Sequence, residues 1–227
     1  MKKKAFYTEI AYVLGLIIMA FAAAFTEKAD FGMSMVVAPA YILHLKISQI
    51  LPWFTFGVAE YFFQGLLVTL TIIIMRKFKV YYLFSFVTAV LYGTLLDAAM
   101  TLIAPLPDGD FAIRILWYIL GTVLCSFAVS LFFHTYLAPE AYELIVKELS
   151  LKTKTDINII KTGYDCFSVI LGIVLSFSFF GFGEFEGVKL GTIICAFING
   201  FLISRFSKVL EHFFEFRNKF KTEKYFK

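Results

Sequence analysis

Two carboxylates lie inside apolar stretches of this chain, where an ionised side chain is costly. Glu60 sits in "FTFGVAEYFFQG", and Asp165 sits in "NIIKTGYDCFSV". A charge at the centre of a membrane helix costs about 2.5–3.5 kcal/mol on insertion scales, and such residues often line ion or proton pathways. We therefore expect Glu60 and Asp165 to form a site for a proton, a cation or a polar solute. The alternative is that each carboxylate only hydrogen-bonds neighbouring helices, or that Asp165 lies at headgroup level.

Six further polar side chains could serve the same site. Asp97 follows Gly93 by four residues and could bind a solute or lie at the outer interface. His134 could relay protons near neutral pH, although a lone interfacial histidine is more often structural. Hydrogen bonds to a solute would come from Tyr41, Tyr92, Tyr142 and Asn199. For these four the alternative is an interfacial aromatic belt or helix–helix bonding.

The composition indicates that a lipid bilayer surrounds these stretches. Of the 227 residues, 60% are hydrophobic and 17% are charged, which leaves too little polar surface for a soluble domain of this size. The apolar stretches are about 20 residues long and lack the period-two alternation of membrane strands. Helices then remain as the way to satisfy the backbone in lipid. The chain is expected to be an all-α integral membrane protein.

Six spans are predicted, with the N-terminus and the C-terminus in the cytoplasm. The predicted spans are residues 8–27, 54–75, 80–103, 113–134, 161–181 and 190–207. With this orientation 17 of the 21 Lys and Arg residues fall on the inside. Cytoplasmic segments carry such an excess of positive charge, so the orientation follows from the positive-inside rule. We expect a multi-pass protein of the inner, or cytoplasmic, membrane.

An internal repeat runs through the chain. "YVLG" returns as "YILG" 106 residues later, "VAPAYILHLK" matches "LAPEAYELIVK", Glu60 falls on Asp165, and Gly93 falls on Gly200. Each repeat holds three spans, so the second must be inverted relative to the first. The predicted division is 1–107 for the first repeat, 108–210 for the second, and 211–227 for a basic cytoplasmic tail.

A short helix is expected after the first span of each repeat. "ADFGMSMVVAPAYILHLKISQI" and "TYLAPEAYELIVKELS" lie between spans, and Pro39 and Pro139 occupy favourable first-turn positions. Such interfacial or re-entrant helices can expose backbone groups to a cavity. The tail "EHFFEFRNKFKTEKYFK" is expected to be helical and to rest on the inner leaflet.

No enzyme constellation is present in the sequence. It contains no Gly-rich phosphate loop, no His-Glu-x-x-His and no Ser-His-Asp set in a polar setting, and we expect no cofactor. The three cysteines lack metal spacing and are expected to be buried thiols. The net charge of +4 follows the topology, so no nucleic-acid partner is expected.

Several of these segments resemble the YczE/YitT-like family of small bacterial membrane proteins. The segments are "ADFGMSMVVAPAYILHLK", "LYGTLLDAAM", "IIKTGYDCFSVILG" and "GVKLGTIICAFINGFL", and the likeness spans nearly the whole chain. The resemblance implies a six-helix bacterial membrane protein and no particular mechanism. After Gly32-Met33-Ser34 the family tends to continue with Pro and Trp or Thr, whereas this chain has Met-Val-Val. If that turn touches a ligand, specificity would differ.

The sequence favours a transporter or channel for a small solute or ion, with its site at the midplane between inverted repeats. Two alternatives stay open. The first is a substrate-binding subunit of a multi-component importer, because the pair Ala20 and Ala24 resembles the docking face of such subunits in vitamin importers. The second is a membrane scaffold or accessory protein without transport. A homodimer or a partner subunit also stays open.

Overall fold

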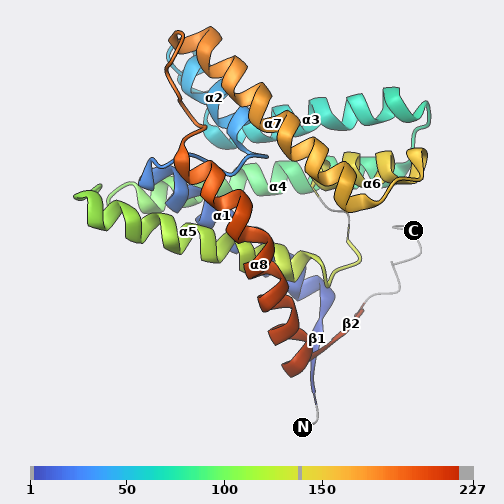
Figure 1. The fold of residues 1–227 in the computed structure, drawn as a ribbon. Coiled ribbons are helices and arrows are strands. Elements are labelled where there is room, and N and C mark those ends of the chain that lie inside the picture. Colours follow the sequence, from blue (N-terminus) through green and yellow to red (C-terminus); the bar gives the residue numbers. More distant parts are fainter. Residues whose placement is uncertain (1–2, 138–139, 220–227) are drawn as a thin grey trace.

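The computed structural model describes residues 3–137 and 140–219, which form eight helices and two short strands (Figure 1). The long helices are α1 (Thr8–Ala29), α3 (Phe56–Met75), α4 (Val80–Ile103), α5 (Phe111–Phe132), α7 (Ile157–Phe180) and α8 (Leu190–Phe213). The short helices are α2 (Ala38–Ile47) and α6 (Ala141–Thr153), and the strands are β1 (Lys4–Tyr7) and β2 (Phe214–Arg217).

The six long helices of this described part are apolar enough to cross a membrane, which confirms the predicted spans. The largest difference is at the end of α8, which continues to Phe213 rather than stopping near residue 207. Helices α2 and α6 confirm the two predicted short helices. Pro39 lies in the first turn of α2 as expected, whereas Pro139 lies outside the described residues.

Local chemistry fixes where several helices begin and end. The side chains of Thr55 and Asp110 each accept a hydrogen bond from the backbone N–H three residues on, at the starts of α3 and α5. Asp30 and Arg76 adopt left-handed backbone conformations, with φ of 54° and 52°, directly after α1 and α3. A left-handed residue stops helix propagation at these positions.

Small residues allow the central helices to pack closely. α1 packs on α5 and on α4, and Ala20 and Ala24 of α1 are buried in these contacts. α3 packs on α4 through Gly57 and Gly93, each of which faces the other's backbone carbonyl oxygen. α2 and α6 each lie against both α3 and α7 (Figure 1).

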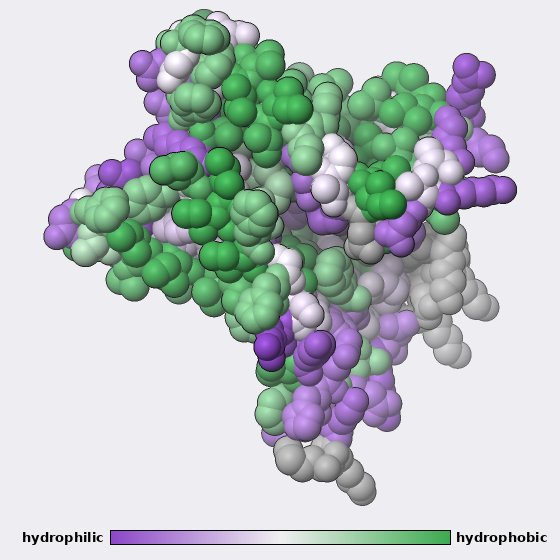
Figure 2. All heavy atoms as spheres, viewed as in Figure 1, coloured by the Kyte–Doolittle hydropathy of each residue, from purple (hydrophilic) through white to green (hydrophobic). Residues whose placement is uncertain are grey.

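α7 and α8 lie at the periphery of the bundle. α8 packs on α5, but within the described residues α7 and α8 do not pack on each other as α3 and α4 do (Figure 1). Figure 2 shows hydrophobic residues over α5, α7 and α8, with hydrophilic residues gathered towards the ends of the molecule. This distribution fits a bundle whose sides face lipid and whose ends face water.

Successive long helices begin at opposite ends of the bundle. One end, here called the distal end, holds the last residues of α1, α4 and α7 and the first residues of α3, α5 and α8. The opposite end, the terminal end, holds the first residues of α1 and the last residues of α8, together with β1 and β2 (Figure 1).

The predicted tail begins inside α8, but Phe214–Arg217 form a strand, so the helical prediction was wrong for these residues. β2 pairs in parallel with β1, and Lys4 aligns with Phe214. Phe214 and Phe216 alternate with the charged residues Glu215 and Arg217, and both phenylalanines pack on Phe6. This period-two pattern suits a strand with one covered face. Residues 220–227 lie outside the described part.

Candidate functional site

A cavity of about 250 Å³ lies inside the bundle, and its lining reaches the last residues of α5 and the first residues of α6 and α7. Its walls come from every long helix except α3, together with α6 and the segments before α2 and α6. Most of the lining is apolar or aromatic, and the charged lining side chains are Glu140, Glu143, Lys161 and Asp165. An apolar pocket with a few convergent polar groups is the usual form of a small-molecule site.

Glu60 lies behind this cavity, at the centre of a buried hydrogen-bond network. Its side chain is fully buried, and its Oε2 accepts hydrogen bonds from the hydroxyl of Tyr142 at 2.8 Å and from Gln64 at 3.3 Å. The Oε1 of Gln64 in turn accepts from the backbone N–H of Ala141 at 3.2 Å. Tyr142 lines the cavity, so Glu60 is one hydrogen bond away from it. The network joins α3 to the start of α6.

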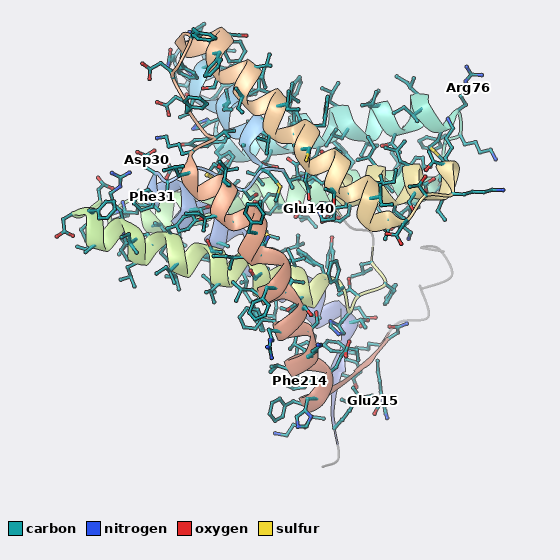
Figure 3. All side chains as sticks on the ribbon, viewed as in Figure 1. Asp30, Phe31, Arg76, Glu140, Phe214 and Glu215 are labelled. Atoms are coloured by element: carbon teal, nitrogen blue, oxygen red, sulfur yellow. The ribbon has the colours of Figure 1, made fainter. Side chains whose placement is uncertain are left out.

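Glu140 directly precedes α6 and lines the cavity. Its residue is 9% exposed, and its Oε1 has no hydrogen-bond partner among the described residues. Burial raises the pKa of Glu140 well above its ordinary value, and the nearby carboxyls of Glu143 and Glu60 raise it further. Figure 3 places Glu140 near the middle of the molecule, with Asp30 and Arg76 towards its opposite ends.

Asp165 lines the same cavity from α7. Its Oδ1 lies 3.7 Å from the ammonium of Lys161, one helical turn earlier. From α8, Asn199 lines the cavity, and its Oδ1 accepts a hydrogen bond from Ser126 at 2.6 Å. Tyr92, which is fully buried, completes the predicted residues that face this space. Within the described residues no hydrogen bond or ion pair joins Asp165 to Glu60.

Asp97, His134 and Tyr41 lie outside the cavity lining. The carboxylate of Asp97 accepts from the Thr55 hydroxyl at 2.6 Å and from the Gly57 N–H at 2.8 Å, and so fastens the start of α3 to α4. At the terminal end, His134 lies 3.3 Å from Glu211 and stacks on the ring of Phe216 in β2. The hydroxyl of Tyr41 lies 3.5 Å from Glu27 at the distal end.

A second, narrower cavity of about 30 Å³ extends from the first towards the distal end. The two share Tyr92 and Cys125 in their linings, and the narrow one continues past Cys195 to Gly32 and Met33. Its volume suffices for a water-sized occupant.

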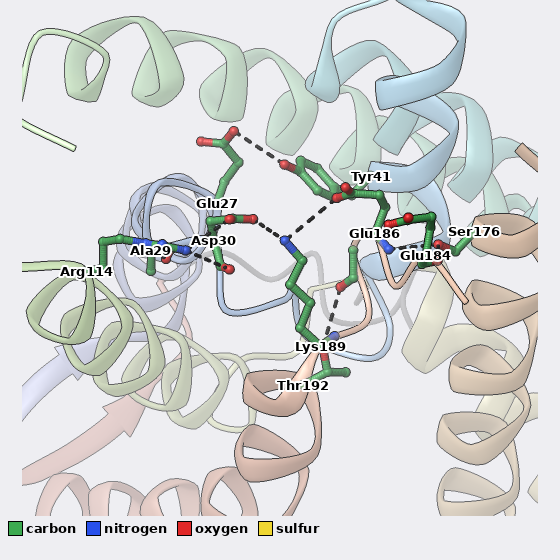
Figure 4. Close-up of polar contacts among 11 residues, drawn as sticks. Glu27, Ala29, Asp30, Tyr41, Arg114, Ser176, Glu184, Glu186, Lys189 and Thr192 are labelled. Atoms are coloured by element: carbon green, nitrogen blue, oxygen red, sulfur yellow. Dashed lines mark hydrogen bonds and ion pairs between the residues drawn. The ribbon is translucent and has the colours of Figure 1, made fainter. Parts of the chain in front are cut away.

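An ion-pair cluster covers the distal end beyond this narrow cavity (Figure 4). Asp30 binds Arg114 at 3.0 Å and Lys189 at 2.5 Å, and Lys189 also lies 3.8 Å from Glu186. We call these four residues the Asp30 cluster. Beneath it, the Gly191 N–H donates to the carbonyl of Phe31 at 2.8 Å. The cluster therefore ties the end of α1 to the starts of α5 and α8.

Sequence reasoning missed Glu140, Glu143, Gln64 and Lys161. Two signals were available. Glu140 is an acid in "LAPEAYE" at the point where the first repeat has only "VAPAY", and Gln64 lies one helical turn after Glu60. No group of three or more His, Cys, Asp or Glu side chains in the described ranges could hold a metal ion.

Comparisons with known proteins give a family and no activity. No curated protein and no solved structure matches the chain. The resemblance to the YczE/YitT-like family stays an expectation, because the family model that matches is a different one. That model, described as a family of unknown function (DUF6198), covers residues 6–208. This chain, with its six long apolar helices and its carboxylate-lined cavity, therefore belongs to the DUF6198 family.

Proposed function

We propose that this protein is a transporter that moves a small solute through the cavity between its helices. The observation that carries the proposal is the cavity itself. It holds about 250 Å³ inside a bundle of membrane-spanning helices and is lined by three carboxyls. Buried ionisable groups are costly in a membrane protein, and their usual role is on a solute or proton pathway.

The packing of the helices supports two inverted repeats, 1–107 and 108–210, as the framework. α4 lies on α1 as α8 lies on α5, and α3 lies on α6 as α7 lies on α2. Two contacts lack a counterpart among the described residues. α3 packs on α4 while α7 and α8 stand apart, and α4 contacts α6 while α8 does not pack on α2. In an inverted-repeat transporter the two halves take up different conformations, and exchanging them moves the opening from one side to the other.

The two ends of the cavity also suit alternating access. The wide cavity reaches the terminal end, whereas the Asp30 cluster covers the distal end. With the termini in the cytoplasm, as the positive charges favour, this conformation is open to the cytoplasm. The proposed location is the bacterial inner membrane.

The importer-subunit alternative loses its sequence support. Ala20 and Ala24 are 1% and 0% exposed, so they do not form a free docking face. An experiment is needed to distinguish the scaffold alternative from transport.

The test begins with a solute screen on the purified full chain in detergent. A ligand that binds only the folded protein raises its apparent stability, by about 2.7 kcal/mol at a hundredfold excess over Kd. Stabilising solutes are then tested for uptake into proteoliposomes. Uptake that is lost in Glu60→Gln and Asp165→Asn, with both variants still folded, supports the proposal.

Other outcomes oppose it. Binding without uptake would favour a subunit that needs an energising partner. A well-folded protein that binds no solute would favour the scaffold, and unchanged uptake in both variants would remove these two acids from the mechanism.

A further inference from the structure

The charged groups around the cavity are unevenly balanced. Among the described residues that line the cavity, Lys161 is the one cation, and it pairs with Asp165. Glu140 and Glu143 also line the cavity, and in the described part of the chain neither forms an ion pair. Ionisation of these two acids would therefore leave the cavity with an excess of negative charge.

Glu140, which lines that space, holds an unused acceptor. Its Oε1 is buried and lacks a hydrogen-bond partner among the described residues, although a buried polar atom without a partner is costly. A donor brought in by a ligand would offset that cost. An anionic solute would meet repulsion from the carboxylates, and a neutral one would leave an ionised Glu140 without a counter-charge.

The remaining walls suit an organic cation better than a bare metal ion. Hard cations such as Ca²⁺ take six to eight oxygen ligands, whereas this lining is mainly apolar. The rings of Tyr12, Tyr92 and Phe132 line the cavity, and aromatic faces attract alkylammonium groups while also packing on hydrocarbon.

We propose that the cavity binds a small protonated amine, with the carboxylate of Glu140 as its counter-charge. This inference rests on the proposed function, since it names the class of solute that the same cavity takes. It also predicts exchange of the cation for a proton, because Glu140 must lose its proton to bind the ammonium group.

Several titratable groups face Glu140. They are Tyr12 from α1, Glu60 from α3, Tyr92 from α4, Cys125 from α5, and Tyr142 and Glu143 from α6. Because burial raises the pKa of Glu140, cation binding should strengthen as pH rises.

Cys125 lines both cavities and reports on this charge directly. In full-length protein carrying Cys166→Ser and Cys195→Ser, Cys125 is the remaining thiol. It is labelled in detergent at pH 8 with two methanethiosulfonate reagents, the cationic aminoethyl and the anionic sulfonatoethyl form. The ratio of the cationic to the anionic rate is compared with the same ratio for free cysteine. Any change in ionisation of the thiol affects both rates and cancels in the ratio.

We expect the Cys125 ratio to exceed that of free cysteine about tenfold or more. Glu140→Gln should bring it back towards the free-cysteine value. Glu148→Gln is the matched control, because Glu148 is a buried acid of α6 that pairs with Lys79 away from the cavity lining. That variant should leave the ratio unchanged.

A ratio at or below that of free cysteine, or one that Glu140→Gln does not alter, would overturn the cation proposal and leave the transporter proposal standing. If neither reagent modifies Cys125 in folded protein, both proposals fail, because the cavity is then not accessible.

Discussion

At the scale of single residues, Glu140 is an acid that is buried although it lies outside the spans. Burial raises its pKa, and Glu143 beside it raises it further. The folded protein thus holds a proton that the unfolded chain releases above the ordinary glutamate pKa of about 4.3. Since the native state then binds more protons, the free energy of unfolding falls as pH rises.

From this we predict that the melting temperature falls between pH 5 and pH 8, and that Glu140→Gln makes the fall smaller. The amide resembles the protonated acid and does not titrate. Thermal melts in detergent at both pH values measure the effect. Glu184→Gln, which changes an exposed loop acid, serves as the control and should follow the wild type. Parallel curves for wild type and Glu140→Gln would contradict the prediction.

The site residues that were predicted from the sequence fall into two groups. Glu60, Asp165, Tyr92, Tyr142 and Asn199 lie at or beside one cavity, because they lie on inward faces of apolar helices. Asp97 has the same kind of sequence context, yet it fastens the start of α3. Apolar surroundings identify a costly carboxylate, but its partner depends on helix packing, which the sequence pattern does not determine.

At the scale of helices, the spans and the two short helices were predictable because length and hydropathy define them locally. The separation of α7 from α8 could not be predicted from length and hydropathy. Gly93 and Gly200 occupy matching positions, but only Gly93 is in close contact with another helix among the described residues. The difference arises from tertiary packing.

This contrast predicts opposite effects of the same substitution. In Gly57→Ala the new methyl would meet the carbonyl oxygen of Gly93 and the carboxyl of Asp97. We expect a loss of about 1–3 kcal/mol, as for other overpacked sites. Gly200→Ala meets no neighbouring atom within 4 Å, and alanine favours a helix over glycine, so stability should hold or rise by up to about 1 kcal/mol. The melting temperatures of the two variants test this prediction. Equal losses of stability in both variants would contradict the packing described for the two glycines.

The Asp30 cluster gives a second prediction at this scale. Asp30→Asn removes its ion pairs with Arg114 and Lys189 while keeping a residue type that tolerates the left-handed conformation. Exposed ion pairs contribute about 0–1 kcal/mol, so the melting temperature should change little. The thiol of Cys195, which is 5% exposed and lines the narrow cavity, should react faster with a thiol reagent.

The matched control is Asp108→Asn, at the same end of the bundle. It removes the ion pair with Lys28 and leaves α8 tied to α1. Labelling of Cys195 should then match the wild type. Equal acceleration in both variants would indicate a general loosening of this end rather than a gate formed by the Asp30 cluster.

At the scale of the whole molecule, the two halves differ in one respect that transport would reverse. α3 and α4 are closed on each other through Gly57 and Gly93, and the matching positions on α7 and α8 are Thr162 and Gly200. If the halves exchange conformations, α7 and α8 must approach at these two residues. A disulfide needs Cα atoms within about 7 Å, so it can trap that approach.

We therefore predict that Thr162→Cys with Gly200→Cys, in a chain whose native cysteines are serines, forms a disulfide in oxidised membranes. Loss of both thiols from maleimide labelling measures it. Ala5→Cys with Glu215→Cys is the positive control, because these two residues are aligned partners in the paired strands β1 and β2. Thr162→Cys with Ile198→Cys is the negative control, because Ile198 lies two residues before Gly200 and so on nearly the opposite face of α8. The bridge should stop solute uptake, and reduction should restore it. If the positive control bridges while the test pair does not, α7 and α8 do not close, and transport by exchange of the two halves is excluded.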